Sequence, residues 1–265
     1  MAASSIALER QDTSNNPALN QEAFNRATAR GGETAARMTA RGAYLKTGLL
    51  LVLTILAAAW GWSQVEVVSA FGRQVAYPPS WLFLAFVLSF VFGVLGVFAG
   101  RFIPIFAIGY ALSYGALLGV ASHYYNLEWN GIVLQAIVAT LAVFGGTWLL
   151  YSLGILKVTS VFAKAVAIAM AGLLLLYFTA WIFSLFGVNF RFLSEPTPLG
   201  ILFALFVVIL AALNLPLDFE FVRRASAAGA PKYMEWYAAH GLMLSMIWLY
   251  VSILRLLALL RSQSR

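Results

Sequence analysis

Seven long stretches without an Asp, Glu, Lys or Arg constrain this sequence more than any other feature. They hold 19 to 28 residues each, and no other uncharged interval approaches that length. A charge at the centre of a bilayer is costly, and a membrane-spanning helix needs about 20 apolar residues. Leu, Ala, Val, Phe and Ile fill the stretches without period-two alternation, which favours helices over the strands of a barrel. The uncharged intervals are 47–65, 74–100, 102–127, 129–156, 165–190, 196–217 and 236–254.

These intervals predict an all-α membrane protein with seven transmembrane helices inside a domain of residues 44–260. The connections are short, and two carry turn signals, at Tyr77-Pro78-Pro79 and at Glu195-Pro196-Thr197-Pro198. Trimmed at charges and turns, the expected spans are 47–64, 81–100, 103–122, 131–153, 165–187, 198–217 and 236–256.

The composition excludes several other classes of protein. Hydrophobic residues make up 62% and charged residues 10% of the chain, whereas soluble domains have about 25% charged residues. A cytosolic enzyme and a free nucleic-acid binder are therefore excluded, so the lipid bilayer is the expected environment. The chain has no cysteine and no catalytic or nucleotide-binding motif. We accordingly expect no enzymatic activity and no resident cofactor.

The first 46 residues hold ten of the 27 charges and have no apolar core. We interpret residues 1–43 as a polar, mostly disordered cytoplasmic tail, and residues 261–265 as a second, short tail. Arg26, Arg30, Arg37 and Arg41 can share one helical face, so the first tail either fixes the topology as a solvated positive segment or binds anionic lipid.

Basic residues set the expected orientation in the cell (inner) membrane. With seven spans and a cytoplasmic N-terminus, twelve basic residues lie inside and five outside, as the positive-inside rule favours. The C-terminus is then external. Arg255, Arg261 and Arg265 fit this arrangement poorly, and a re-entrant last segment would place them inside.

The sixth expected span ends in a candidate ion site. Asn214 and Asp218 are four residues apart and therefore share a helix face, and Pro216 between them frees a backbone carbonyl near position 212. Carboxylate, amide and carbonyl oxygens can hold a hard cation, or the carboxyl can hold a proton as it is desolvated. Alternatively, Asp218 is an interfacial carboxylate that ends the helix among lipid headgroups.

Three further titratable residues flank the same connection. Glu220 lies roughly opposite Asp218, where we expect it to be solvated or paired with Arg223 or Arg224. Glu235 opens the last span, where a negative charge suits a helix N-terminus, although it could also face Asp218. His240 lies deeper and could titrate, or could be a neutral imidazole bonded to a neighbouring helix.

Small residues recur at spacings that allow helices to approach closely in lipid. They are Gly96 and Gly100, Gly115 and Gly119, and the pair Gly145-Gly146.

Several segments resemble the bacterial branch of the Bax inhibitor-1 family. The most specific is Gly-Ala-Pro-Lys-Tyr-Met-Glu-Trp-Tyr-Ala-Ala at 229–239, which follows Asn-Leu-Pro-Leu-Asp-Phe-Glu-Phe at 214–221. Ser-Asn-Asn-Pro at 14–17, Gly-Ile-Val-Leu-Gln-Ala at 131–136 and Gly-Ile-Leu-Lys-Val-Thr at 154–159 are also similar. The resemblance covers residues 14–260, about the whole predicted membrane domain.

The resemblance implies six helices around a central seventh and a pH-sensitive calcium leak, with calcium or protons as partners. It also implies a pair of aspartates on the sixth and seventh helices that share a proton and gate the pore. Asp218 matches the first aspartate, but the second would fall near Met243, and a third-span acid is replaced near Tyr114. The departures leave room for an alternative, a non-conducting regulator of a membrane-protein partner such as a membrane protease.

Overall fold

The computed structural model describes residues 37–263, apart from 71–72, 189, 191–192 and 194. It is almost entirely helical, and the sequence-based prediction of an all-α membrane protein is confirmed. The elements are α2 (Ala40–Ser63), β1 (Glu66–Ala70), β2 (Arg73–Tyr77), α3 (Leu82–Phe98), the 3-10 turn η2 (Gly100–Phe102), α4 (Ile103–Glu128), α5 (Ile132–Ser152), α6 (Ser160–Leu185), α7 (Pro198–Ala227) and α8 (Met234–Gln263).

Seven helices match the seven expected spans in order. Six are long and apolar enough to cross a membrane, whereas α3 has 17 residues. At about 1.5 Å per residue, α3 is somewhat shorter than a typical hydrocarbon core. α8 is one continuous helix of 30 residues, so the described chain shows no re-entrant break in its last hydrophobic segment.

Three of these helices have a threonine as their N-cap. Thr39, Thr159 and Thr197 are N-caps whose hydroxyl oxygens accept hydrogen bonds from the backbone N–H of Gly42, Phe162 and Gly200. Each bond satisfies a donor that the first helical turn would otherwise leave unpaired. Caps and exposed charges let the helices continue beyond the apolar stretches, so α2 begins seven residues before the expected span and α7 ends ten residues after it.

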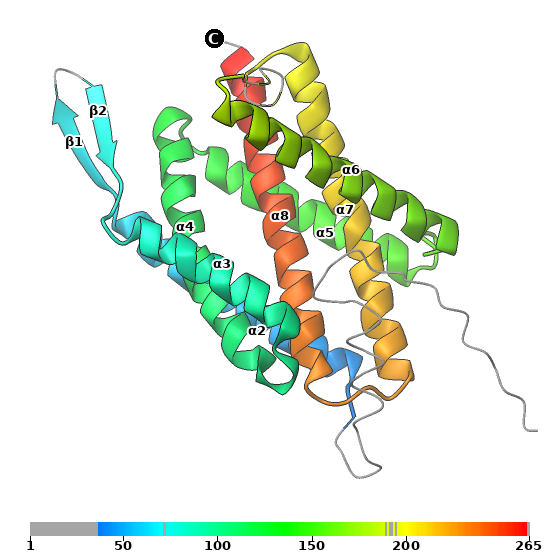
Figure 1. Ribbon diagram of the computed structural model, residues 1–265. Helices are drawn as coiled ribbons and strands as arrows, with labels where there is room; N and C mark the ends of the chain where they lie inside the picture. The colour runs from blue at the N-terminus through cyan, green and yellow to red at the C-terminus, as the bar shows by residue number, and fades with distance from the viewer. Residues whose placement is uncertain (1–36, 71–72, 189, 191–192, 194, 264–265) are drawn as a thin grey trace, which may run out of the picture.

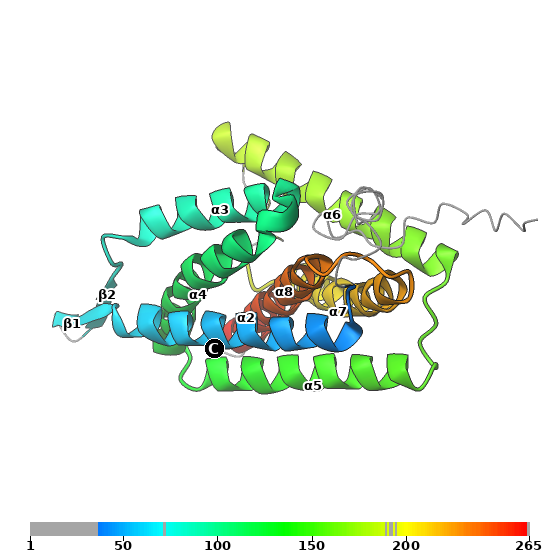
Figure 2. The ribbon, with the colours of Figure 1, turned by 90° about the horizontal axis from the view of Figure 1, so that it is seen from below.

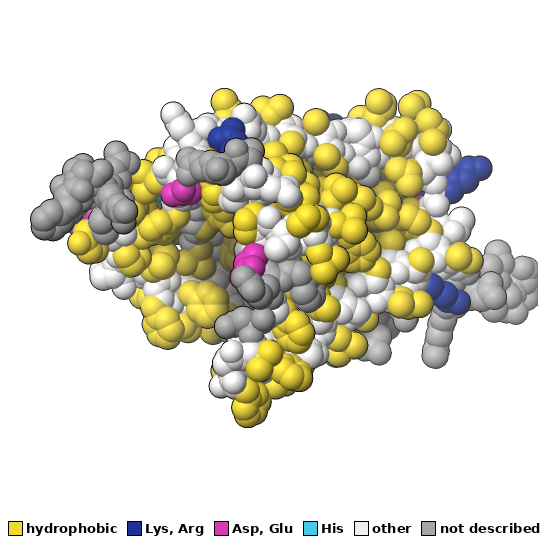
Figure 3. All heavy atoms as spheres, turned by 90° about the horizontal axis from the view of Figure 1, so that it is seen from above, with side chains coloured by type: hydrophobic (Ala, Val, Ile, Leu, Met, Phe, Trp, Pro, Cys, Tyr) yellow, Lys and Arg dark blue, Asp and Glu magenta, His cyan; other side chains and the backbone are white. Residues whose placement is uncertain are grey.

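The last helix lies at the centre of the bundle. α8 packs against α2, α4, α5 and α7, and its apolar window has the largest buried share of the six long helices. Figure 2 shows α7 and α8 nearly end on, with α2 and α5 on one side and α3 and α6 on the other. α3 packs mainly on α4, and α6 on α7. The outer surface is largely hydrophobic, as the face in Figure 3 shows.

The closest helix pair is α2 with α4, and glycines make it possible. A Cβ at Gly115 would lie 2.6 Å from the Thr54 carbonyl oxygen, and one at Gly119 would overlap the Ala58 carbonyl. The predicted close approach at Gly115 and Gly119 is therefore confirmed. A Cβ at Gly145 would meet nothing within 4 Å, so the expectation of close packing there is wrong.

A β-hairpin that the sequence analysis did not predict projects from the bundle between α2 and α3 (Figure 1). Its strands are antiparallel and pair Glu66 with Tyr77 at the open end. The strands were not predicted because the uncharged intervals end before Glu66 and begin again only after Arg73.

Candidate functional site

Asp218 lies in the interface between the two central helices, α7 and α8. Its side chain is fully buried, and so is almost all of Asn214, one turn earlier on the same face of α7. The neighbouring Leu215, Leu217 and Phe219 are also buried. The alternative of an interfacial carboxylate that ends the helix among lipid headgroups is therefore wrong, because α7 continues for nine residues beyond Asp218 and the side chain is buried inside the bundle.

A serine from α8 completes the polar cluster. The Ser245 hydroxyl donates a hydrogen bond of 2.5 Å to Oδ2 of Asp218. The Asn214 side-chain amide donates to Ser245 Oγ at 2.9 Å and to the same Asp218 oxygen at 3.4 Å. Ser245 was not identified from the sequence, since nothing in an uncharged span distinguishes one serine from another before the helices are placed.

The cluster can accommodate a proton. A hydroxyl can donate or accept, so Ser245 can reverse its role if the carboxyl gains a proton. The buried Asn214 Oδ1 has no hydrogen-bond partner among the described residues, and it offers a further acceptor. No cluster of three or more His, Cys, Asp and Glu residues forms a metal site in the described part of the chain.

The helix α7 passes through Pro216 without ending. Proline removes one backbone donor from the helix interior, and the described segment stays helical because both neighbouring turns are packed in the core. Pro216 itself is buried, and it lies between Asn214 and Asp218 in the sequence.

Glu220 belongs to a separate network at the end of α5. Tyr151 donates to Oε2 of Glu220 at 2.6 Å, and Arg223 and Arg224 form ion pairs with Oε1 at 2.5 and 2.6 Å. The side chain is buried, so the expectation of a solvated carboxylate is wrong, whereas the expected pairing with the two arginines is present. Tyr151 covers the acid and was missed because it lies 69 residues away.

Glu235 links the N-terminal ends of α2 and α8. It is fully buried and pairs with Lys46 and, at 2.9 Å, with Lys232. It also accepts hydrogen bonds from the backbone and hydroxyl of Thr39. A Cβ at Gly42 would overlap the Glu235 carboxylate, so a larger residue there would require this side chain to shift. Through these contacts, Glu235 holds the N-terminal ends of α2 and α8 together.

His240 is fully buried in α8, but it lies outside the Asp218 cluster. Its ring stands perpendicular to that of Tyr110 at a centroid distance of 5.2 Å. Neither ring nitrogen has a hydrogen-bond partner among the described residues. The expectation of a hydrogen bond to a neighbouring helix is therefore wrong, because the imidazole packs against the Tyr110 ring and the small residue Gly96 instead.

Met243, where the resemblance would place a second aspartate, is also fully buried. It packs with Leu50, Ala107 and Ala111, toward α2 and α4. Its sulfur accepts a hydrogen bond of 3.5 Å from the Thr54 hydroxyl. The position therefore belongs to an apolar cluster, whereas Ser245 of α8 donates a hydrogen bond to Asp218.

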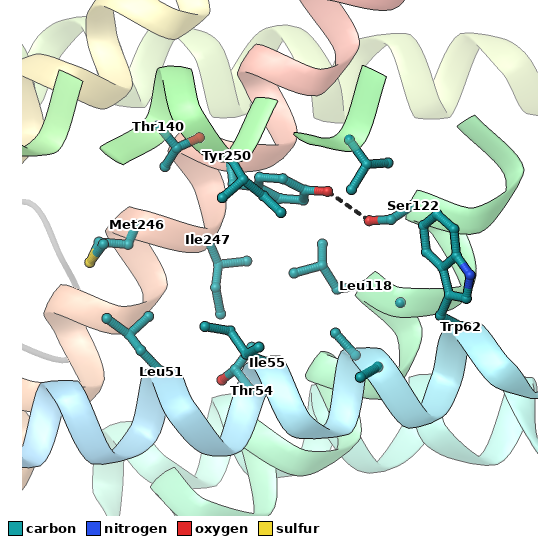
Figure 4. A pocket seen from close by; sticks show the side chains of 15 residues that line it. Leu51, Thr54, Ile55, Trp62, Leu118, Ser122, Thr140, Met246, Ile247 and Tyr250 are labelled. Atoms are coloured by element: carbon teal, nitrogen blue, oxygen red, sulfur yellow. Dashed lines mark hydrogen bonds between the residues drawn. The ribbon is translucent and has the colours of Figure 1, made fainter. Parts of the chain in front are cut away.

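A largely apolar pocket of 420 Å³ lies beside the central helix (Figure 4). α2, α4, α5 and α8 all contribute to its walls, including Ile55 and Ile247. Tyr250 of α8 and Ser122 of α4 share a hydrogen bond of 2.8 Å at this pocket. The pocket reaches α8 within two residues of Ser245, through Met246 and Ile247.

Comparison with known proteins gives one family. The family model described as Bax inhibitor 1 like matches residues 16–262, which include six of the seven helices in full and all but the last residue of α8. The comparisons with curated proteins and with solved structures find no match.

Proposed function

The chain belongs to the Bax inhibitor 1 like family, and we propose from this premise that it is a calcium leak channel whose conduction depends on pH. The fold is that of a multi-pass membrane protein in a lipid bilayer. Calcium is the cargo and protons regulate its passage, so the proposal includes neither catalysis nor a resident cofactor.

The burial of Asp218 at the α7–α8 interface is the observation that carries the proposal. A carboxylate inside a spanning bundle is expensive and usually belongs to an ion path or a proton relay. Here a hydroxyl and an amide donate to it, and both groups can adapt to a change in its charge. Because an aspartate pair is absent, gating would depend on this cluster of Asn214, Asp218 and Ser245.

The proposal also includes an orientation. We propose that the protein resides in the inner membrane of a bacterium with its N-terminus in the cytoplasm. The ion pairs of Lys46, Lys232, Arg223 and Arg224 would then lie near the cytoplasmic leaflet, as the positive-inside rule favours. The end of α8 would lie outside.

Calcium flux into proteoliposomes tests the proposal directly. We expect the wild-type protein to conduct with a pH-dependent rate, and Asp218→Asn to conduct at a rate that no longer changes with pH, because the amide cannot gain or lose the proton. Ser245→Ala should shift the pH at which the rate changes, since it removes the 2.5 Å hydrogen bond.

Two control variants separate this role from general damage. Ser252→Ala alters another buried serine of α8, whose hydroxyl bonds to the Trp248 carbonyl. Glu66→Gln alters an exposed acid on the hairpin. Both should keep the wild-type pH dependence. Equal flux of wild type and Asp218→Asn at every pH would remove Asp218 from the mechanism.

The alternative is a non-conducting regulator of a membrane-protein partner, such as a membrane protease. The apolar packing of Met243 favours it, since the second acid of a gate is replaced there by a side chain that cannot ionise. Absence of calcium flux at any pH, together with a stable partner that co-purifies from membranes, would favour this alternative.

A further inference from the structure

A second pocket lies at the far end of the bundle from the charged network of Glu235. It has a volume of 570 Å³ and is formed where the C-terminal part of α8 meets the ends of α4 and α6. Figure 1 shows these ends together near the C-terminus. Four aromatic side chains contribute to its walls, Tyr125 and Trp129 from the end of α4 and Tyr177 and Trp181 from α6.

One guanidinium lines this pocket. Arg255 is half-buried, and its Nη1 donates a hydrogen bond of 3.1 Å to the Tyr177 phenol oxygen. None of the ion pairs found among the described residues involves Arg255. A guanidinium has five N–H donors and no acceptor, so Arg255 can still offer a pair of parallel donors to an anion.

Two other pocket residues also supply donors. The indole nitrogen of Trp129 is sealed from solvent and has no acceptor among the described residues. A buried donor without an acceptor is uncommon and calls for a partner such as an ion or a ligand. Because the Tyr177 oxygen accepts from Arg255, its own hydroxyl proton can point toward a ligand. Guanidinium, indole and phenol together form a donor set that suits a phosphate oxygen.

The surroundings favour a lipid as the source of the phosphate. Tyr and Trp are enriched at the level of lipid headgroups, and Trp181 is 59% exposed on the outer surface of α6. The pocket is much larger than a phosphate group and falls in the range of ligand sites, about 300–1,000 Å³. Arg261, two turns further along α8, binds the Asn130 carbonyl and Gln135, so it has other partners.

From these contacts we propose that the pocket of Arg255, Trp129 and Tyr177 binds the phosphate of an anionic membrane lipid. The site would also account for a basic residue at an end of the bundle where the positive-inside rule disfavours one. It is independent of calcium conduction, because none of its residues belongs to the Asp218 cluster.

Native mass spectrometry of the full chain, released from nanodiscs of mixed phosphatidylglycerol and phosphatidylcholine, tests the proposal. We expect retained phosphatidylglycerol on the wild-type protein, and at least tenfold weaker retention for Arg255→Gln. Trp129→Phe keeps the ring and removes the donor, and it should weaken retention severalfold. Arg101→Gln, which alters an exposed arginine in η2, is the matched control and should behave as wild type.

Two further arms identify the source of the anion. If millimolar inorganic phosphate displaces phosphatidylglycerol from the wild-type protein and from Arg101→Gln alike, the site accepts phosphate itself, and the lipid supplies it in the membrane. If phosphate binds while phosphatidylglycerol is not retained, the lipid assignment is wrong. Equal retention of both lipids by wild type and Arg255→Gln would overturn the proposal. Should Arg255→Gln fail to fold, Arg255→Lys, which keeps the charge and loses the paired donors, should still bind more weakly than wild type.

Discussion

Replacing Gly119 by alanine tests whether backbone contact between α2 and α4 holds this side of the bundle together. An added Cβ would overlap the Ala58 carbonyl, a backbone group that cannot rotate away. α2 would have to move as a body, and overpacking of this kind costs about 1–3 kcal/mol. The overlap is with the carbonyl oxygen, carbon and Cα together, which places the cost at the upper end of that range.

The same substitution also stabilises the helix, and this stabilisation must be subtracted from the cost of overpacking. Alanine is better than glycine inside a helix by about 0.8–1.0 kcal/mol. The net loss of stability for Gly119→Ala is then about 1–2 kcal/mol. For Gly145→Ala, where the new Cβ meets nothing within 4 Å, only the gain remains. The two variants make the same chemical change in a helix interior and should shift stability in opposite directions.

The assay is the temperature at which half of the purified protein stays monodisperse after heating in detergent. For a chain of this size, about 1 kcal/mol corresponds to about 2–4 °C. Gly119→Ala should therefore lower the midpoint by several degrees, and Gly145→Ala should leave it unchanged or raise it. A midpoint for Gly119→Ala at or above that of Gly145→Ala would refute the packing argument.

Two polar networks give further predictions for the same heating assay. Lys46→Met removes the better-buried partner of Glu235 and should cost about 1.5–3 kcal/mol, as for other hydrogen bonds to charged groups, whereas Lys232→Met should cost less than about 1 kcal/mol because that lysine is 52% exposed. Equal effects of the two lysines would contradict the assigned burial. Tyr151→Phe removes the 2.6 Å hydrogen bond to Glu220 and should also cost about 1.5–3 kcal/mol; an unchanged midpoint would show that the two arginines alone satisfy the carboxylate.

The helices were predictable because the bilayer imposes one requirement on every span. A charge-free stretch of sufficient length leaves few alternatives to a helix in lipid, and this requirement is local to each segment. The hairpin and the helix ends were not predictable in the same way. Thr39 starts α2 before the apolar stretch through a side-chain cap, and the two acids that follow Leu217 receive hydrogen bonds from Ser245 of α8 and Tyr151 of α5.

The candidate site was only half predictable for a related reason. The spacing of Asn214 and Asp218 places both on one face of α7, but it cannot tell which face meets α8. The face of α7 that meets α8 depends on how the two helices pack. The position of Ser245 beside the carboxylate depends on the same packing. Glu220 is two residues further on and meets Tyr151 and two arginines instead. Similar sequence positions thus acquire different chemistry from tertiary structure alone.

The difference between these acids decides which of them is suited to a proton-dependent function. Arginine and lysine side chains only donate, so a proton added to Glu220 or Glu235 would face donors and disrupt an ion pair. Serine can exchange the roles of donor and acceptor by rotating one bond, and Asn214 has an amide oxygen available within the described structure. Asp218 can therefore gain a proton without losing the Ser245 hydrogen bond, which is why the proposed pH-dependent step is assigned to this carboxyl and not to Glu220 or Glu235.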